Sequence, residues 1–220
     1  MRIGRNLMRE VRMFLFQLRS IRGVLWVPAA VEFLLLPWLL MLTMKKYQDI
    51  WYVEDTFQLM TQYLVPVLSV WWLSFAFIEM IEGDGSELHY VNHRMKDNLA
   101  LLWLGAYLLM TALGCGIASM WIGNAWMEFL RMVICSCFYV GLAYGTMFWS
   151  GSMTVTFLVV VIYWMASLFG GNFPLPILNC YDGLAMSMEL LSAKYVYIML
   201  TAVVLYVLGC IGNQRKERYV

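Results

Sequence analysis

The most polar stretch between two hydrophobic runs of this sequence covers residues 82–94, and it holds both histidines of the chain. His89 and His93 are four residues apart, so they would share one face of a helix. Glu87 is the one acid placed to join them as a ligand. Because zinc sites normally use three or four protein ligands, this spacing predicts no metal site. The stretch is better interpreted as a surface that meets a partner.

Sequence motifs for other chemistry are missing. The chain has no G-x-x-x-x-G-K-[ST] phosphate loop and no H-E-x-x-H zinc motif. Ser150 and Ser152 have no intramembrane histidine to activate them, which disfavours a serine protease or another small intramembrane enzyme. We therefore predict no catalytic residue, no cofactor or metal held by this chain, and no nucleic-acid partner.

Glu32 is the acidic residue that stands out within a hydrophobic run, about two turns from its start. A charge at the bilayer centre costs about 2.5–3.5 kcal/mol on insertion scales, so such residues usually face protein or water. Glu32 could line a polar cavity or pair with a basic group. Alternatively, it could be protonated and bonded to a neighbouring helix, or reach back to the nearby interface.

Composition places these residues in a membrane protein. Hydrophobic residues make up 62% of the 220 residues and charged residues 13%, against about 25% charged residues in soluble domains. Continuous apolar runs of about 20 residues predict membrane-spanning helices rather than barrel strands. We expect an all-α polytopic membrane protein with a six-span domain over residues 24–212. The predicted spans are Val24–Met44, Gln58–Ile81, Leu99–Trp121, Met127–Trp149, Thr154–Gly170 and Lys194–Gly212.

Basic residues set the predicted orientation through the positive-inside rule. Six arginines precede the first span, Arg94 and Lys96 follow the second, and three basic residues lie in the tail 213–220. With six spans all of these fall on one side, so both termini are predicted to be cytoplasmic. The opposite side would carry Arg131 and Lys194 near helix ends, with loop residues Lys45, Lys46, Asp49, Glu54, Asp55 and Asp182.

Three segments outside the spans have distinct patterns. Residues 1–23 alternate arginines with apolar residues at helical spacing, which predicts an interfacial amphipathic helix rather than a cleaved signal peptide. Residues 171–193 contain Pro174 and Pro176 and are half apolar, which predicts a broken outer segment with a short helix that enters the leaflet or caps the bundle. Cys180 lies alone on that side, so no disulfide is predicted.

Most tryptophans fit the interfacial belts of a membrane protein, but four lie deeper in the predicted spans. Packing against neighbouring helices would explain them. A wall that contacts an apolar substrate is the alternative. The four are Trp38, Trp71, Trp72 and Trp164.

The segment 82–98 also carries a family resemblance. Its pattern of Glu82, Gly85, Ser86, Glu87 and Leu88, with Arg94 beyond, resembles the segment after the second span in type-2 ATP-binding-cassette exporter permeases. Six spans, the basic N-terminal helix and the broken outer segment are similar to that family too. The chain differs by lacking the usual second leucine and the proline after it, where His89 and Asn92 stand.

The resemblance implies a coupling helix in residues 82–98 that docks on a separate ATPase subunit, present in two copies, which binds ATP and Mg²⁺. It assigns coupling to Glu82, Gly85, Glu87, Leu88 and Arg94. An ordinary solvated loop is the alternative. The resemblance also implies a second permease copy or a sister chain, which we expect to pack across spans one and five. Glu32, Trp38, Trp71 and Trp72 would then lie near the substrate pathway.

We therefore expect a multi-pass protein of a bacterial plasma membrane that exports amphipathic or hydrophobic peptides, such as bacteriocins or toxins. Such export often protects the producing cell. The alternative is a membrane protein that binds without pumping, such as an immunity protein or a vitamin-capturing S-component, which also has about six spans.

Overall fold

The computed structural model describes residues 26–83, 96–169 and 176–217, together with Phe14 and Gly23. These residues form helices joined by short turns, with no strand among them. Five helical spans are long and apolar enough to cross a membrane, and three of them combine several of the elements named below. A sixth, α9, is a shorter apolar helix of 16 residues. The all-α polytopic fold is confirmed. The helices are α2 (Trp26–Ala30), α3 (Leu36–Tyr47), α4 (Ile50–Tyr63), α5 (Val65–Glu82), α7 (Lys96–Ala118), α8 (Ala125–Ser150), α9 (Met153–Leu168), α10 (Met188–Leu190) and α11 (Val196–Glu217).

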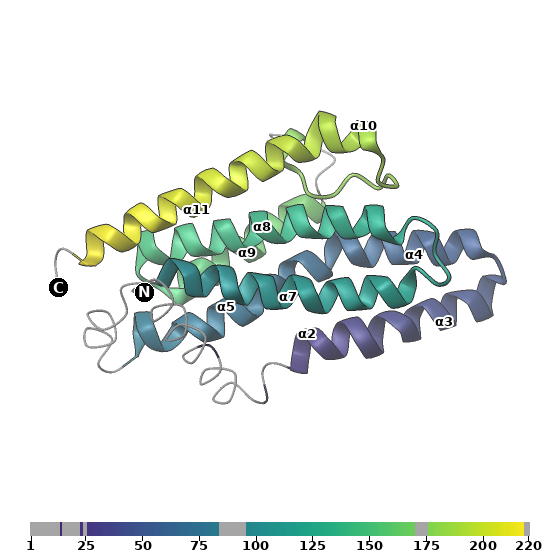
Figure 1. Ribbon diagram of the computed structural model, residues 1–220, viewed down its shortest axis with the longest axis horizontal. Helices are drawn as coiled ribbons and strands as arrows, with labels where there is room; N and C mark the ends of the chain where they lie inside the picture. Colours follow the sequence, from purple (N-terminus) through teal and green to yellow (C-terminus); the bar gives the residue numbers. More distant parts are fainter. Residues whose placement is uncertain (1–13, 15–22, 24–25, 84–95, 170–175, 218–220) are drawn as a thin grey trace, which may run out of the picture.

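The long helices lie roughly parallel or antiparallel to one another along the long axis of the molecule, which is horizontal in Figure 1. Glu82 at the end of α5 bonds to the start of α9, and Asp97 at the start of α7 bonds to Asn213 near the end of α11. These contacts define one end of the bundle, called the inner end here because the sequence predicts it to be cytoplasmic. The α3–α4 turn and the start of α8 lie at the opposite end, called the outer end.

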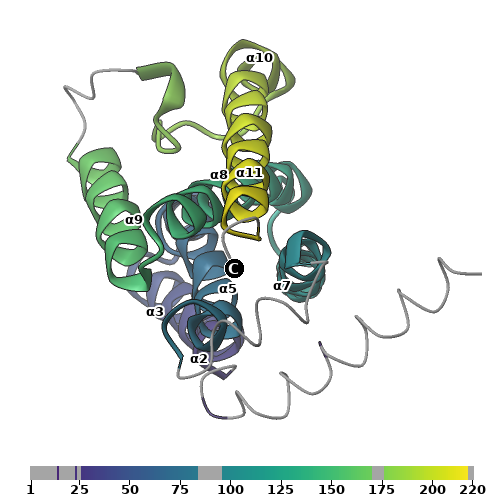
Figure 2. The same ribbon diagram turned by 90° about the vertical axis from the view of Figure 1, so that its left-hand side faces the viewer.

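Helix α8 is the centre of the bundle, and about two thirds of its membrane-crossing residues are buried. Figure 2 shows it surrounded by α5, α7, α9 and α11. Glycines allow α11 to approach it closely, since a Cβ atom added at Gly141 would lie 2.7 Å from the Ala202 carbonyl oxygen. Small residues commonly permit such close backbone approach between membrane helices.

The first two spans form a tight hairpin. Gln48 ends α3 in the left-handed conformation with a φ of 54°, and the Asp49 carboxylate then caps α4 by accepting from the Trp51 amide at 3.0 Å. The predicted outer loop with Glu54 and Asp55 is therefore wrong, because both residues lie on α4. Helices α4 and α5 together form one long span that starts earlier than predicted.

Two five-residue π-helical turns interrupt the spans, at Val31–Leu35 in the first and at Leu191–Tyr195 in the last. In the first, the Leu36 amide bonds back to the Val31 carbonyl, and Pro37 follows without an amide proton to give. π-helical turns occur frequently at functional sites. Here each turn carries an ionisable side chain, Glu32 in the first and Lys194 in the second.

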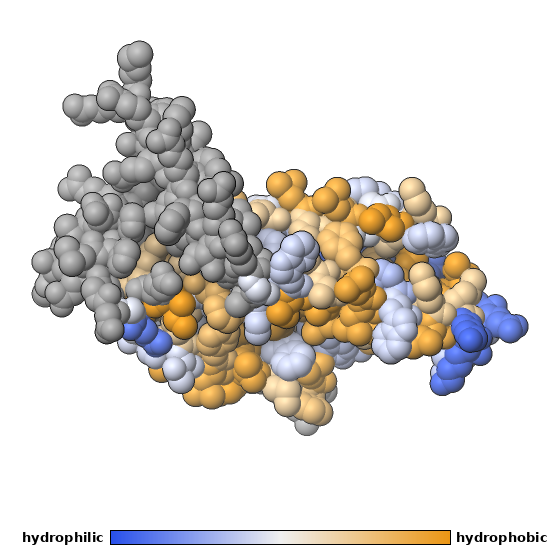
Figure 3. All heavy atoms as spheres, turned by 90° about the horizontal axis from the view of Figure 1, so that it is seen from below, coloured by the Kyte–Doolittle hydropathy of each residue, from blue (hydrophilic) through white to orange (hydrophobic). Residues whose placement is uncertain are grey.

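Apolar side chains cover much of the described outer surface. Figure 3 shows them along the lower face, with hydrophilic residues gathered at the right-hand end, where the α3–α4 turn lies. The first span, Trp26–Tyr47, is the least buried of the five long helices, and Leu34 on it is 70% exposed. A soluble monomer rarely exposes so large an apolar area, which supports a lipid bilayer as the surroundings of this chain.

The structure reaches only part of the terminal segments. Helix α11 continues to Glu217, so the predicted basic tail 213–220 begins as the last turn of a helix. Most of the predicted interfacial helix 1–23 lies outside the described residues. Phe14 is described, and the centre of its ring lies 4.7 Å from that of Trp103 on α7.

Candidate functional site

Glu32 is buried inside the bundle, with 5% of its surface exposed. Neither carboxylate oxygen has a hydrogen-bond partner among the described residues, nor does an ion pair within them reach it. The Tyr107 hydroxyl lies near the carboxylate but donates its proton to the Val65 carbonyl. An unsatisfied buried acceptor costs about 1–3 kcal/mol, so this position is energetically unusual.

Glu32 lines a partly open cavity of about 430 Å³, whose walls come mainly from the first span, α4, α7 and α8. The sequence left open whether Glu32 lines a polar cavity; it does line a cavity, but the walls are mostly apolar. Thr61 and Thr111 are in the lining, yet their hydroxyls donate to carbonyls of their own helices, at 2.9 and 3.0 Å. Among the described residues, no lysine or arginine belongs to the lining.

The depth of Glu32 differs from the sequence expectation. The sequence predicts that Glu32 lies about two turns from the cytoplasmic end of the first span. In the structure it faces Gly114 on α7, where an added Cβ would lie 3.7 Å from the Glu32 Oε2 atom. Gly114 comes 18 residues after the start of α7 at Lys96, about 27 Å along the helix. The first span is thus shifted outward, and Glu32 lies in the outer half of the bundle.

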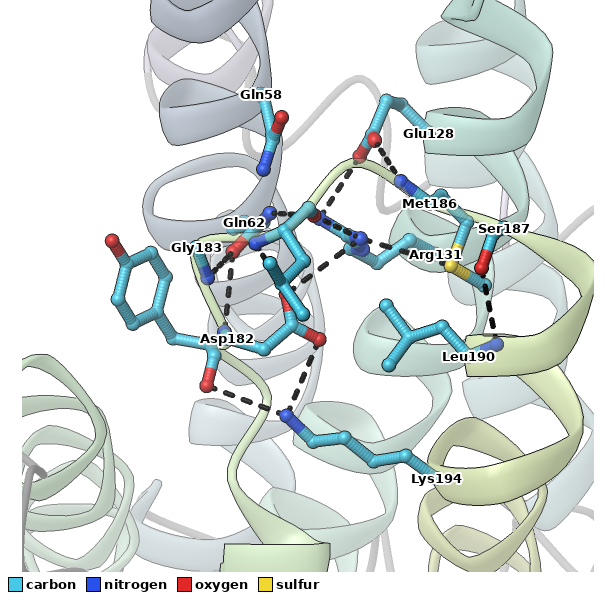
Figure 4. A network of polar contacts seen from close by, with 12 residues as sticks. Gln58, Gln62, Glu128, Arg131, Asp182, Gly183, Met186, Ser187, Leu190 and Lys194 are labelled. Atoms are coloured by element: carbon cyan, nitrogen blue, oxygen red, sulfur yellow. Dashed lines mark hydrogen bonds and ion pairs between the residues drawn. The ribbon is translucent and has the colours of Figure 1, made fainter.

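A second group of buried charges lies close by, centred on Arg131 of α8 (Figure 4). Its side chain is fully buried, and its Nη1 atom lies 3.2 Å from Glu128 Oε2, an ion pair by distance without hydrogen-bond geometry. The Nη2 atom donates to the Leu184 carbonyl at 2.6 Å and lies 3.7 Å from Asp182 Oδ1. The guanidinium therefore joins α8 to the outer segment.

Further contacts fix Asp182 from both sides. Its Oδ2 atom accepts from the Tyr195 hydroxyl at 2.9 Å and lies 3.3 Å from Lys194 Nζ. The Gln62 side chain of α4 accepts from the Asp182 and Gly183 amides, both at 3.4 Å. We call Gln62, Glu128, Arg131, Asp182, Lys194 and Tyr195 the outer clamp.

The outer clamp holds two acidic and two basic side chains, so its formal charge is zero. It pins the segment between α9 and α11 onto the bundle (Figure 4). The sequence predicts that Arg131, Lys194 and Asp182 lie on this side, but it does not predict that they meet, and it gives no role to Glu128. The spacing of Glu128 and Arg131, three residues apart on a helix, was the signal that could have found the pair.

The described part of the outer segment is mostly irregular. It contains the 3₁₀ turn Pro176–Leu178, a folded loop, and the short helix α10, which leads into the π-helical turn Leu191–Tyr195. Cys180 in this loop is 1% exposed and lies near Cys135 of α8, and both cysteines are free thiols.

The four deep tryptophans lie in different surroundings within this chain, and the pathway assignment of Trp38, Trp71 and Trp72 stays a prediction. Trp72 is buried in the core, with ring centres 6.0 Å from Trp103 and 5.7 Å from Tyr107. Trp38 is 56% exposed on the first span, and Trp71 is partly buried against the core. The Trp164 indole donates to the Tyr63 carbonyl at 2.9 Å, where α4 gives way to α5. Within this single chain, Trp72 packs in the core, and Trp164 supplies a hydrogen bond to a backbone carbonyl.

Of the predicted coupling residues, Glu82 alone lies in the described part of the chain. Its Oε1 atom accepts from the Met153 amide at 2.7 Å and from the Ser152 hydroxyl at 3.1 Å, so it caps the start of α9. Gly85, Glu87, Leu88 and Arg94 lie outside the described residues, as do His89 and His93, and their assignments stay predictions. The described ranges contain no cluster of three or more metal-ligating side chains.

Comparisons with family models, with curated proteins and with solved structures gave no match. The physical features of the chain therefore carry the functional argument.

Proposed function

We propose that this chain is the membrane subunit of an exporter for amphipathic or hydrophobic peptides, driven by a separate ATPase. The observation that carries the proposal is the apolar cavity with one unpartnered carboxylate, Glu32, inside a bundle of membrane-spanning helices. Such a cavity suits a molecule with an apolar body and a polar group. Because the sequence has no phosphate loop, the energy for pumping has to come from another subunit.

The position of Glu82 supports the predicted coupling role of the segment that follows it. Glu82 ends α5 at the inner end and holds the start of α9 through two hydrogen bonds. A partner that moved the segment after Glu82 would therefore act on both α5 and α9. In this proposal Glu87 and Arg94 make charged contacts with the ATPase, and two permease chains pack across the first span and α9.

The second candidate is a protein that captures a ligand without pumping it. One observation favours it: the lining of the cavity includes Met44 and Ile50 beside the α3–α4 turn, and Trp121 beyond the end of α7. The cavity thus reaches the outer end, as capture from outside would require. The two functions differ in whether an ATPase binds the inner end.

The experiment that tests the export proposal is purification of the tagged chain from its native membrane, with ATP hydrolysis as the readout. We expect an ATPase subunit in a one-to-one ratio with the chain and vanadate-sensitive hydrolysis. The Glu87→Lys variant should lose both, since removing one partner of a buried charge pair costs about 2–5 kcal/mol. Asp55→Lys, which changes an exposed acid at the outer end, should lose neither. Normal hydrolysis by the Glu87→Lys complex would refute the coupling assignment.

A further inference from the structure

The cavity beside Glu32 combines three properties that together specify a kind of ligand. It holds about 430 Å³, its walls are mostly apolar, and its one ionisable carboxyl has no hydrogen-bond partner in the described residues. Small-molecule sites typically measure about 300–1,000 Å³. The space therefore suits a compact molecule or one side chain of a larger one, but not a folded peptide.

Three hydroxyl groups beside Glu32 or in the cavity lining donate to backbone carbonyls. The Thr61 and Thr111 hydroxyls donate to their own helices, and the Tyr107 hydroxyl donates to the Val65 carbonyl. None of these three protons is donated to Glu32, whose carboxylate oxygens have no hydrogen-bond partner among the described residues. A bound ligand that carries several N–H donors and a positive charge would supply it.

We infer that this cavity binds an amphiphilic molecule with a single ammonium group, which pairs with Glu32 while its apolar body fills the space between α4, α7 and α8. An anionic ligand would meet a like charge, and a neutral apolar ligand would leave the carboxylate buried without a partner. Within the described part of the chain, the lining holds no lysine or arginine that would compete for Glu32.

The inference deepens the proposed function, on which it rests only for the identity of the cargo. In an exported peptide, the ammonium would belong to a lysine side chain or to the N-terminus, beside apolar residues. Binding itself is measured on the purified chain without any ATPase. A failure of the site and a failure of the export proposal are therefore distinguishable.

The test uses three probes that share one apolar cage: 1-(aminomethyl)adamantane, 1-adamantanemethanol and 1-adamantanecarboxylate. Calorimetry with the full chain in lipid nanodiscs, against empty nanodiscs, gives their affinities. We expect the amine to bind at least about tenfold more tightly than the alcohol, the step that a charge-assisted hydrogen bond provides. The carboxylate should show no binding. Equal affinities for the amine and the alcohol would overturn the inference. The same result is expected if another part of this chain already pairs with Glu32, so that case would also overturn it.

Two variants locate the binding. Glu32→Gln keeps the shape of the side chain and should lower the affinity for the amine to that for the alcohol, whose own affinity should not change. Gly114→Leu places a side chain beside Glu32 and should abolish binding of both. Its matched control is Gly116→Leu on the same helix, where an added Cβ meets no atom within 4 Å. Amine binding that survives Glu32→Gln, or that falls equally in both leucine variants, would overturn the assignment. If Glu32→Gln fails to fold, the probe series and the Gly114–Gly116 pair still decide the question.

Discussion

The outer clamp and the Glu32 cavity both bury ionisable side chains in the outer half of the same bundle, yet they treat charge in opposite ways. In the clamp, two acids face two bases, and Arg131 and Asp182 bind backbone groups as well. In the cavity, one carboxylate stands without a described partner. Cys115 on α7 lies near both Glu32 and Glu128, so the two regions are neighbours.

Whether a buried charge has a partner distinguishes structural side chains from candidate functional ones better than the exposed fraction does. Arg131 is 0% exposed and Glu32 is 5% exposed, so burial alone would rank them together. A buried charge with an opposite charge and hydrogen bonds can fix one arrangement of the chain, here the position of the outer segment. A buried charge without a partner destabilises the fold unless something else binds it.

The largest expected effect comes from breaking the clamp at its centre. Arg131→Met keeps much of the side-chain length but leaves Glu128 and Asp182 without their shared cation. Removing one partner of a buried ion pair costs about 3–5 kcal/mol, so the free energy of unfolding should fall by that amount. Thermal unfolding in mild detergent, followed by the loss of helical signal, measures it.

The matched control for that variant is Lys45→Met, which removes an exposed cation near the end of α3. It should change the free energy of unfolding by less than about 0.5 kcal/mol, as surface substitutions usually do. An equal loss of stability in Arg131→Met and Lys45→Met would show that the clamp does not hold the outer segment. The rate of proteolysis within residues 179–187, compared between Arg131→Met and wild type, is an independent measure of how firmly the outer segment is held.

The opposite sign is expected at Glu32. Glu32→Leu replaces an unpartnered carboxylate with an apolar side chain that suits the walls of the cavity. Relief of an unsatisfied buried acceptor should raise the free energy of unfolding by about 1–3 kcal/mol. The same unfolding experiment checks it, with wild type and Glu32→Gln alongside. A loss of stability as large as that of Arg131→Met would mean that Glu32 has a structural partner, and the contrast between the two regions would fail.

Export provides a second measurement on Glu32→Leu. If Glu32 lies on the pathway, transport of a cationic amphipathic peptide should fall while the amount of protein in the membrane stays constant. Unchanged transport by a more stable variant would place Glu32 outside the pathway.

The smallest effect is expected at the edge of the clamp. Lys194 is 14% exposed and contacts Asp182, which retains Arg131 and the Tyr195 hydroxyl as partners. Lys194→Met should therefore lower the free energy of unfolding by about 0.5–1.5 kcal/mol, the net value of one hydrogen bond. A double variant with Arg131→Met should show coupling between the two sites, since both contact one carboxylate. Strict additivity would argue against a shared clamp.

The helices were predictable because their signal is local. Runs of apolar residues long enough for a bilayer have to satisfy their backbone within the segment, and all six predicted spans correspond to helices. Boundaries were less accurate where polar residues continue a helix beyond the apolar run, as Glu54 and Asp55 do at the start of α4. The Asp49 cap and the left-handed Gln48 set that boundary. A search for apolar runs does not detect such capping residues.

For the candidate site too, the sequence predicted one part and the tertiary structure decided the other. The sequence by itself determined that Glu32 is an intramembrane acid and that Arg131, Asp182 and Lys194 lie toward one side, because residue type and position along a span are enough for both statements. Only the tertiary structure decided which of these charges meet. The outward shift of the first span brings Glu32 to Gly114, and the fold of the outer segment brings Asp182 to Arg131. Both of these contacts join residues more than 50 positions apart, so they are set by how the helices pack; the pairs Glu128–Arg131 and Asp182–Lys194 are closer in sequence.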